Sequence, residues 1–573
     1  MATPSVALPP GPYAAAGPTM HWHDRLAQGL LVVCCAALAL CLIGPLAMIL
    51  VKSVQDKDGA FVGLALFREY FATPALQRSV WNTLWVASVV TLVTVPLAFA
   101  YAYALTRSCM PGKTVFRVIA LTPILAPSLM SAISFIQWFG TQGLLKGLLF
   151  GASVYGPIGI ILSSIYATFP HALMIVLTAL LLSDGRLYEA AESLRTPTWR
   201  RFFTITLPGA KYGLVSATMV VFSYTVSDFG IPKVIGGSFD VLAIDLFKQV
   251  IGQQNFNKGA VVSLILLLPV LFAFSVDWIM RRRLQAQFSS RAVPYVPRPS
   301  PGFDRTMFAF CSLVSLIMLA VLGMAVYTSF IKLWPYDLSF SLRHYVYGLI
   351  DAGVIVDYFN SLKMAFYSAL FGTIFIFAVA YLLEKTRGMA TLKGFVRLVA
   401  TIPMAVPGLV LGLGYIFFFN HPDNPLNGLY GTMTILVLST IVHYYTSSHM
   451  TAVTALKSMD DEFESVSASL KVPFYRTFFR VTVPVCLPAI LDIGRYLFVN
   501  GMVTISAAVF LYAPDTRVAS VAILNMDEAG EIGAAAGMAT LIVASSTAMC
   551  ILYAIVTRVL LRRTQAWRTA ART

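Results

Sequence analysis

Five ionisable side chains lie inside long apolar segments, where a charge is costly: Asp228, Asp277, Lys363, Asp492 and Arg495. Such residues mark solute or ion pathways, or structural pairs. Asp277 is followed by three arginines, and Lys363 lies near the end of an apolar segment, so both are expected to reach the interface. The chemistry that these side chains could support is the binding and passage of a small polar solute.

Two close pairs are the candidates for a translocation pathway. Asp492 and Arg495 are three residues apart, so they can pair on one helix face. Arg495 is expected about ten residues into its span, near the midplane, where it could instead offer bidentate donors to an oxyanion. Asp228 and Lys233 surround a Gly and a Pro where the helix is predicted to break. They either line the outer mouth of the pathway or form a local ion pair.

Motifs for catalysis or metal binding are missing from the sequence. It has no Gly-x-x-x-x-Gly-Lys-Ser/Thr phosphate loop and no His-Glu-x-x-His pair, and its seven cysteines have no paired spacing. His171, His443 and His449 lie in or near apolar segments and are expected to make polar contacts between helices. We therefore predict no catalytic residue, no metal site and no cofactor, and ATP-driven work would need a separate ATPase.

Composition identifies the elements that hold these residues as membrane helices. Of the 573 residues, 58% are hydrophobic and 12% are charged, and the mean hydropathy is +0.76. Soluble domains carry about 25% charged residues. The basic residues behind the net charge of +15 lie mainly in loops beside apolar segments. We therefore predict membrane lipid as a partner and no nucleic acid. The predicted fold class is an all-α polytopic membrane protein.

Windows of about 20 apolar residues predict twelve transmembrane helices. They lie near 26–51, 81–105, 118–140, 157–182, 214–234, 260–280, 307–330, 359–383, 398–420, 431–455, 485–512 and 534–560. Prolines inside these segments do not exclude a membrane helix, because neighbouring helices can satisfy the freed backbone groups.

The distribution of Lys and Arg predicts the orientation. Of the 41 basic residues, 28 lie in the N-terminal tail, every second connection and the C-terminal tail, and 11 lie in the other connections. The positive-inside rule therefore places both termini in the cytoplasm. The N-terminal 25 residues lack a basic run, so they are expected to be a cytoplasmic tail and not a cleaved signal.

The chain contains an internal repeat. "RVIALTPILAP" at 117–127 matches "RLVATIPMAVP" at 397–407, and 184–208 matches 460–484 with 9 identities in 25 positions. A fused pair of parallel six-helix halves follows. The predicted parts are an N-terminal tail (1–25), a first half (26–280), a cytoplasmic linker (281–306), a second half (307–560) and a basic tail (561–573).

The longest repeated cytoplasmic loops, 183–213 and 456–484, each predict two short amphipathic helices. In the first loop Leu187, Ala190, Ala191 and Leu194 form an apolar face at helical spacing. Such a face needs either a protein partner or the membrane interface. Its occurrence at the same place in both halves favours a protein partner.

These loops resemble the EAA loop of ABC importer permeases. The first loop has Glu189-Ala190-Ala191, then Arg195 at the family's Gly position, and ends at Pro208 with the family's spacing. In the second loop the pattern is degenerate, with Ser465-Val466-Ser467 in place of Glu-Ala-Ala. Its matching residues are the displaced Glu464, Ser467, Leu470, the basic Lys471 at the Gly position, and Pro484.

The resemblance implies that these residues, together with Leu194, couple the chain to a cytoplasmic ABC ATPase dimer. Because both loops lack the Gly, the family's turn geometry is not assumed.

The resemblance extends over nearly the whole chain, including "LTRSCMPGKTVFR" and "SDFGIPKVIGGSFDVLAIDLFKQVIGQQNFNKGAVV". It is to fused permeases of the type I ABC importer fold, and most of all to those for 2-aminoethylphosphonate. It implies a bacterial inner-membrane subunit fed by an extracytoplasmic solute-binding protein. Ferric iron, thiamine and polyamine permeases share the layout and remain alternatives. An ion-coupled secondary transporter would need more intramembrane carboxylates, and a membrane enzyme would need a catalytic constellation.

Overall fold

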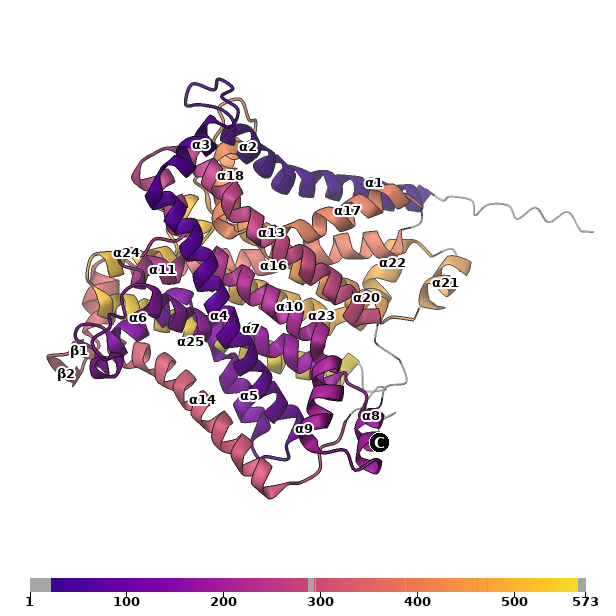
Figure 1. The fold of residues 1–573 in the computed structure, drawn as a ribbon. Coiled ribbons are helices and arrows are strands. Elements are labelled where there is room, and N and C mark those ends of the chain that lie inside the picture. Colours follow the sequence, from indigo (N-terminus) through magenta and orange to yellow (C-terminus); the bar gives the residue numbers. More distant parts are fainter. Residues whose placement is uncertain are drawn as a thin grey trace, which may run out of the picture.

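Long apolar helices form most of the fold, and their ends gather at two opposite sides of a bundle (Figure 1). The computed structural model describes residues 22–286, 293, 295–386, 388–460, 462–470 and 472–564. In this part of the chain nine helices are long and apolar enough to cross a membrane, or up to eleven if two bent pairs are counted as spans. The predicted polytopic membrane class is thereby confirmed.

The first half contains thirteen α-helices within the described residues. They are α1 (Trp22–Leu38), α2 (Gly44–Ser53), α3 (Ala65–Ala72), α4 (Pro74–Arg107), α5 (Lys113–Leu121), α6 (Ser128–Phe139), α7 (Pro157–Leu181), α8 (Gly185–Ser193), α9 (Thr198–Arg201), α10 (Leu207–Ser227), α11 (Gly230–Ile235), α12 (Leu242–Phe247) and α13 (Phe256–Ala286).

The second half adds twelve α-helices and a hairpin. They are α14 (Pro301–Ser329), α15 (Arg343–Tyr345), α16 (Ile355–Lys385), α17 (Ala390–Thr401), α18 (Gly408–Phe419), α19 (Met433–His443), α20 (Tyr445–Lys457), α21 (Glu462–Ser469), α22 (Phe474–Thr477), α23 (Val483–Val503), α24 (Ala519–Glu528) and α25 (Ile532–Thr564), with β1 (Ile331–Leu333) and β2 (Asp337–Phe340). The strands pair antiparallel, so the protein is nearly all helical, as predicted.

Two of the twelve predicted spans are wrong as continuous helices. The segments 118–140 and 398–420 are bent pairs, with angles of 103° between α5 and α6 and 115° between α17 and α18. Each bend follows a 3₁₀ turn and centres on a proline, Pro127 or Pro407, with extended backbone. Proline lacks the amide donor and keeps the preceding residue out of the helical region, so the chain turns there.

Two further spans end early at matching places. The predicted 214–234 segment stops at Ser227, where Asp228 is extended with ψ 131°, as the predicted break required. The predicted 485–512 segment stops at Val503, where Thr504 is extended with ψ 135°. The predicted 431–455 segment is also divided, into α19 and α20 at Tyr444. Span prediction from hydropathy missed these breaks because the chain stays apolar through them.

The first long helix of each half packs on the other half. Helix α1 packs on α16 and α17 of the second half, and α14 packs on α5 and α6 of the first half as well as on α25 of its own. In Figure 1 α1 runs beside α17, and α14 runs beside α5. The two halves are therefore held together by exchanged helices as well as by their facing surfaces.

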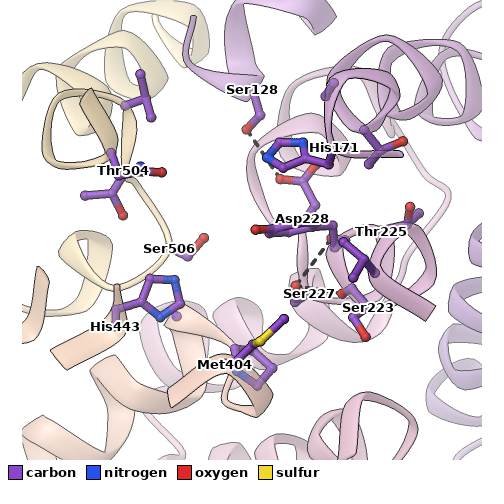
Figure 2. A pocket seen from close by; sticks show the side chains of 18 of the residues that line it. Ser128, His171, Ser223, Thr225, Ser227, Asp228, Met404, His443, Thr504 and Ser506 are labelled. Atoms are coloured by element: carbon purple, nitrogen blue, oxygen red, sulfur yellow. Dashed lines mark hydrogen bonds between the residues drawn. The ribbon is translucent and has the colours of Figure 1, made fainter. Parts of the chain in front are cut away.

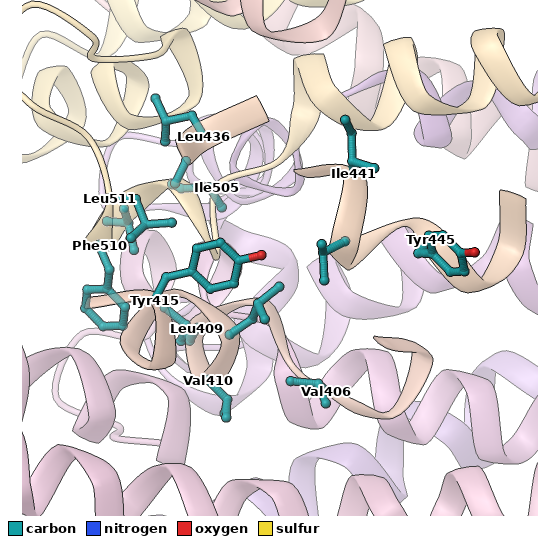
Figure 3. Close-up of a cluster of buried hydrophobic side chains, with 14 of the residues drawn as sticks. Val406, Leu409, Val410, Tyr415, Leu436, Ile441, Tyr445, Ile505, Phe510 and Leu511 are labelled. Atoms are coloured by element: carbon teal, nitrogen blue, oxygen red, sulfur yellow. The ribbon is translucent and has the colours of Figure 1, made fainter. Parts of the chain in front are cut away.

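The second half's bent pair is anchored in a dry core. Figure 3 shows Leu409, Val410 and Tyr415 of α18 packed with Ile505 and Phe510 from the segment after α23. All five are less than 9% exposed. Within a membrane, close van der Waals packing of this kind holds helices together, so these contacts stabilise the bend.

Candidate functional site

The first of the two matching loops, for which a coupling role is predicted, contains an ordered pair of short helices, α8 and α9. Asp184 caps α8 by accepting a hydrogen bond from the amide of Arg186 (3.1 Å). The Arg186 guanidinium also bonds this carboxylate and lowers the pKa of Asp184 to about 2. At the other end of the loop, Pro208 lies in the first turn of α10, and Pro484 occupies the same place in α23.

Arg195 makes the turn that the family's Gly would make. Its φ is +49°, in the left-handed region. The amide of Thr196 bonds the Ala191 carbonyl (2.9 Å), and the amide of Arg195 bonds the Glu192 carbonyl (2.8 Å). These two bonds form a Schellman motif. The first loop therefore makes a left-handed turn without a glycine.

The second loop repeats part of this turn. The amide of Val472 bonds the Ser467 carbonyl at 2.9 Å, the counterpart of the Thr196 bond. Lys471 and the side chain of Glu464 lie outside the described residues.

Five matching positions in the two loops expose apolar side chains. Each pair is separated by 276 residues: Leu187 and Phe463, Ala190 and Val466, Leu194 and Leu470, Trp199 and Tyr475, Phe203 and Phe479. Leu194 is 79% exposed and Leu470 is 70% exposed. We call these two sets the first and second docking faces. Both lie at the same end of the bundle, where Figure 1 places α8 and α21.

The inward side of each coupling helix is held by the rest of the loop. Ala191 is buried, and its counterpart Ser467 is half-buried and shares a 2.5 Å hydrogen bond with Thr477. Glu189 and Arg195 are exposed beside the first docking face. Ser467 therefore has a structural contact, and Val466 is the residue of the second triplet that faces outward.

A cavity of about 280 Å³ lies between the two halves, next to the two breaks in α10 and α23. Figure 2 shows Ser128, His171 and Asp228 on the wall from the first half, facing His443 and Ser506 from the second. The Asp228 carboxylate accepts hydrogen bonds from Ser128 Oγ and from the amide of Ile231, both at 3.3 Å. We call this cavity the chamber. The break in α10 places the Asp228 carboxylate at its wall.

The chamber lining is rich in oxygen and imidazole groups. Among the described residues that line it are two carboxylates, two histidines and several tyrosines and serines, but neither Lys nor Arg. Asp277 is already bound by Arg281 Nε (2.7 Å) and by Ser216. Asp228 is therefore the carboxylate of the lining that has no cationic partner among the described residues.

The other pathway candidates lie elsewhere. Lys233 Nζ pairs with Glu528 of α24 at 2.6 Å, so the local pair with Asp228 that we considered does not form. Asp492 and Arg495 pair at 3.1 Å, as predicted, with side chains 61% and 45% exposed. Neither lines the chamber. Because α23 ends at Val503, Arg495 lies eight residues, or about 12 Å, before the break.

Sequence reasoning missed the second half's share of the chamber. His443, Thr504 and Ser506 line it, and His443 Nδ1 is buried without a hydrogen-bond partner. The polar contact between helices expected of His443 is therefore not formed by this atom. The internal repeat could have pointed to these residues, because Thr504 lies 276 residues after Asp228 and so occupies the matching position of the second half. Among the described residues, no group of three or more His, Cys, Asp or Glu side chains could hold a metal ion.

Comparison with known families gives two matches along the chain. Residues 94–285 and 372–565 match the family described as binding-protein-dependent transport system inner membrane component. The two matches together cover more than half of the chain, with one in each half.

Three relatives illustrate the range of the similarity. A ferric transport system permease protein of Actinobacillus pleuropneumoniae is 28% identical over 494 residues, covering 83% of this chain and 71% of the relative. An Fe(3+)-transport system permease protein of Haemophilus influenzae is 23% identical over 522 residues, covering 90% and 95%. A spermidine/putrescine transport system permease protein of the same species is 20% identical over 260 residues, covering 42% and 91%.

Proposed function

The chain belongs to the family of binding-protein-dependent transport system inner membrane components, and we propose that it is the fused permease of an ABC importer for ferric iron. In this proposal an extracytoplasmic binding protein delivers the solute to the end of the bundle that holds α11 and α24. Each of the two docking faces binds one subunit of a cytoplasmic ATPase dimer. Closure of that dimer by ATP moves α8 and α21 and opens the chamber alternately to the two sides.

The observation that carries the coupling role is the pair of docking faces. A large apolar side chain left in water costs about 1.5–3 kcal/mol relative to a buried one, and at four of the five matching positions both halves expose one. Exposed apolar patches of this kind mark protein interaction sites. Two equal faces at one end of a duplicated chain match a dimeric partner.

The substrate in this proposal differs from the 2-aminoethylphosphonate that the sequence resemblance favoured. Two relatives that align with most of the chain are named as permeases of ferric iron transport systems. Ferric iron was one of the alternatives that the sequence left open. The chamber lining agrees with a cation, since Asp228 has no cationic partner in the described lining and carboxylate oxygen is a ligand for hard metal ions. The phosphonate group of 2-aminoethylphosphonate would find no Lys or Arg among the described lining residues, although its ammonium group could pair with Asp228.

A polyamine is the second candidate. It is also a cation, and the spermidine/putrescine permease of Haemophilus influenzae aligns with one half of the chain.

The proposed orientation follows the basic residues. We place both termini and the coupling loops in the cytoplasm of a bacterium, and the β1–β2 hairpin outside its inner membrane. Reporter fusions test this: a reporter that needs the cytoplasm should be active when joined after Arg563. Activity of an external reporter at that position would contradict the orientation.

The deciding experiment is transport in proteoliposomes that contain the permease, with its ATPase inside and its binding protein outside. We expect uptake of radioactive ferric iron that requires both ATP and the binding protein. Uptake of a polyamine or of 2-aminoethylphosphonate in place of iron would overturn the substrate and leave the subunit role. Uptake driven by an ion gradient without ATP would overturn the importer class.

A further inference from the structure

The segment between the two halves lies directly on the first coupling helix. Helix α13 ends at Ala286 and α14 begins at Pro301, so the linker is shorter than the predicted 281–306. Its described residues are 293 and 295–300, which we call the strap. The strap leads into α14, which packs on α5 and α6 of the first half as well as on α25 of the second.

One end of the strap is bonded to the start of α8. The amide of Gly185 donates to the carbonyl of Val293 at 2.8 Å, and the amide of Val293 lies 3.4 Å from Oδ1 of the capping Asp184. The backbone of the strap is therefore hydrogen-bonded to the two residues at the N-terminal cap of α8.

The middle of the strap makes an aromatic contact with α8, with the two rings tilted by 50°. The ring of Tyr295 lies 4.5 Å from the ring of Tyr188, centroid to centroid. The Arg107 guanidinium lies 4.6 Å from the Tyr295 ring and 4.9 Å from the Tyr188 ring. Arg107 is only 7% exposed and also bonds the Leu180 carbonyl at 2.9 Å. Tyr295 thus joins α8 to the ends of α4 and α7 through one buried cation.

The far end of the strap is bonded to α14 and to the loop after α4. Arg298 pairs with Glu192 on α8. Asp304 of α14 accepts from the amide of Cys109 at 2.7 Å and from the amide of Ser300 at 2.9 Å. The coupling helix is therefore connected through the strap to a helix of the second half.

The second half lacks the residues for an equivalent aromatic contact. The positions 276 residues after Tyr188 and Glu192 are Glu464 and Ala468. Neither is aromatic, and alanine cannot form an ion pair. Among the residues that the structure describes, this attachment therefore occurs at α8 and has no counterpart at α21.

We propose that the strap is a positioning element that fixes α8 to the first half, so that α8 transmits ATPase motion as a rigid part of the bundle. Helix α21 also transmits this motion, but without such a rigid attachment. The positioning role rests on the proposed function, since α8 is taken to carry the ATPase contact. The strap's hold on α8 itself does not depend on any partner. The key residue is Tyr295.

Amide hydrogen exchange of the permease alone, in lipid nanodiscs, tests the hold. In Tyr295→Ala we expect the amides of α8 to exchange about tenfold faster, with α21 unchanged, because one ring contact and one cation–π contact are lost. Tyr295→Phe keeps the ring and should exchange like the wild type. Val296→Ala is the matched control on the same strap, because Val296 is 78% exposed. Unchanged α8 exchange in Tyr295→Ala would overturn the proposal.

Coupling is the second readout, and Arg298→Ala is the milder variant should Tyr295→Ala fold poorly. With the ATPase and binding protein present, we expect Tyr295→Ala to keep the ATPase bound but to hydrolyse several-fold more ATP per solute imported. Arg298→Ala should show a smaller rise, of about twofold. An unchanged ratio together with faster α8 exchange would overturn the positioning role. Failure of the wild type to bind an ATPase would overturn the proposed function, and the exchange comparison would still decide whether the strap holds α8.

Discussion

Beside the chamber, the bend and the broken helix of each half meet in one close contact between a serine and a glycine. The serine and the glycine have exchanged places between the two halves. In the first half Ser128 follows Pro127 and packs on Gly230, where an added Cβ would lie 2.7 Å from Ser128 Oγ. In the second half the corresponding contact is between Gly408 and Ser506, with an added Cβ 2.7 Å from Ser506 Cβ. The bend and the broken helix approach so closely that only one of the two positions can carry a side chain.

The reversal has a consequence for the chamber wall. Ser128 supplies a hydroxyl that bonds Asp228 in the first half, whereas Gly408 has no side chain to offer Thr504, the counterpart of Asp228. Duplication thus kept the backbone geometry of the contact, while the polar groups beside it became different. Both carboxylates of the described lining, Asp228 and Asp277, come from the first half, whose bend carries the serine.

The largest expected effect tests whether the docking faces are equivalent. Leu194→Glu and Leu470→Glu each place a charge in a proposed buried contact, at a cost of about 2–5 kcal/mol. We expect each to weaken co-purification of the ATPase by about 30-fold or more. Phe61→Glu, at an equally exposed residue (79%) in another loop, is the control. Full ATPase binding by both variants would remove the coupling role of these faces, and loss in only one would make the halves unequal.

The reversed contact predicts a rescue. Gly408→Ser should destabilise the protein by about 1–3 kcal/mol, because the new side chain meets Ser506. Adding Ser506→Gly gives the second half the first half's arrangement and should restore most of the loss. Thermal unfolding in detergent measures both variants. A double variant no more stable than Gly408→Ser alone would show that the two contacts are not equivalent.

The exposed pair on α23 is expected to matter less. Asp492→Ser with Arg495→Met copies Ser216 and Met219, which occupy the matching positions of the first half. The double change removes both charges together and leaves neither unpaired, and such replacements are often neutral or stabilising, so stability should fall by no more than about 1 kcal/mol and uptake by no more than about twofold. Poor import by a folded double variant that still binds its ATPase would return Arg495 to the pathway.

The smallest effect concerns the turn after α8. Arg195→Gly should stabilise the protein by about 0.5–1 kcal/mol, because a left-handed conformation costs a side-chain-bearing residue about 1–2 kcal/mol and glycine loses about half of this gain through backbone entropy. The shift in thermal midpoint reports it. A destabilised variant would mean that contacts of the Arg195 side chain outweigh its backbone strain.

The features that the sequence predicted correctly are local or repeated ones. The apolar windows identified the membrane class, and the match between 184–208 and 460–484 located two loops that form paired short helices in both halves. The Asp492–Arg495 pair was also predictable, because a spacing of three residues on a helix brings two side chains together.

The sequence by itself therefore determined that this is a duplicated membrane protein with two matching loops, because hydropathy and repeat spacing do not depend on distant contacts. Only the tertiary structure decided that α10 and α23 end beside a shared chamber, that Lys233 pairs with Glu528, and that the strap lies on α8. Each of these joins residues at least about 100 positions apart. Such contacts are chosen by the packing of whole helices, which no local pattern of residue types specifies.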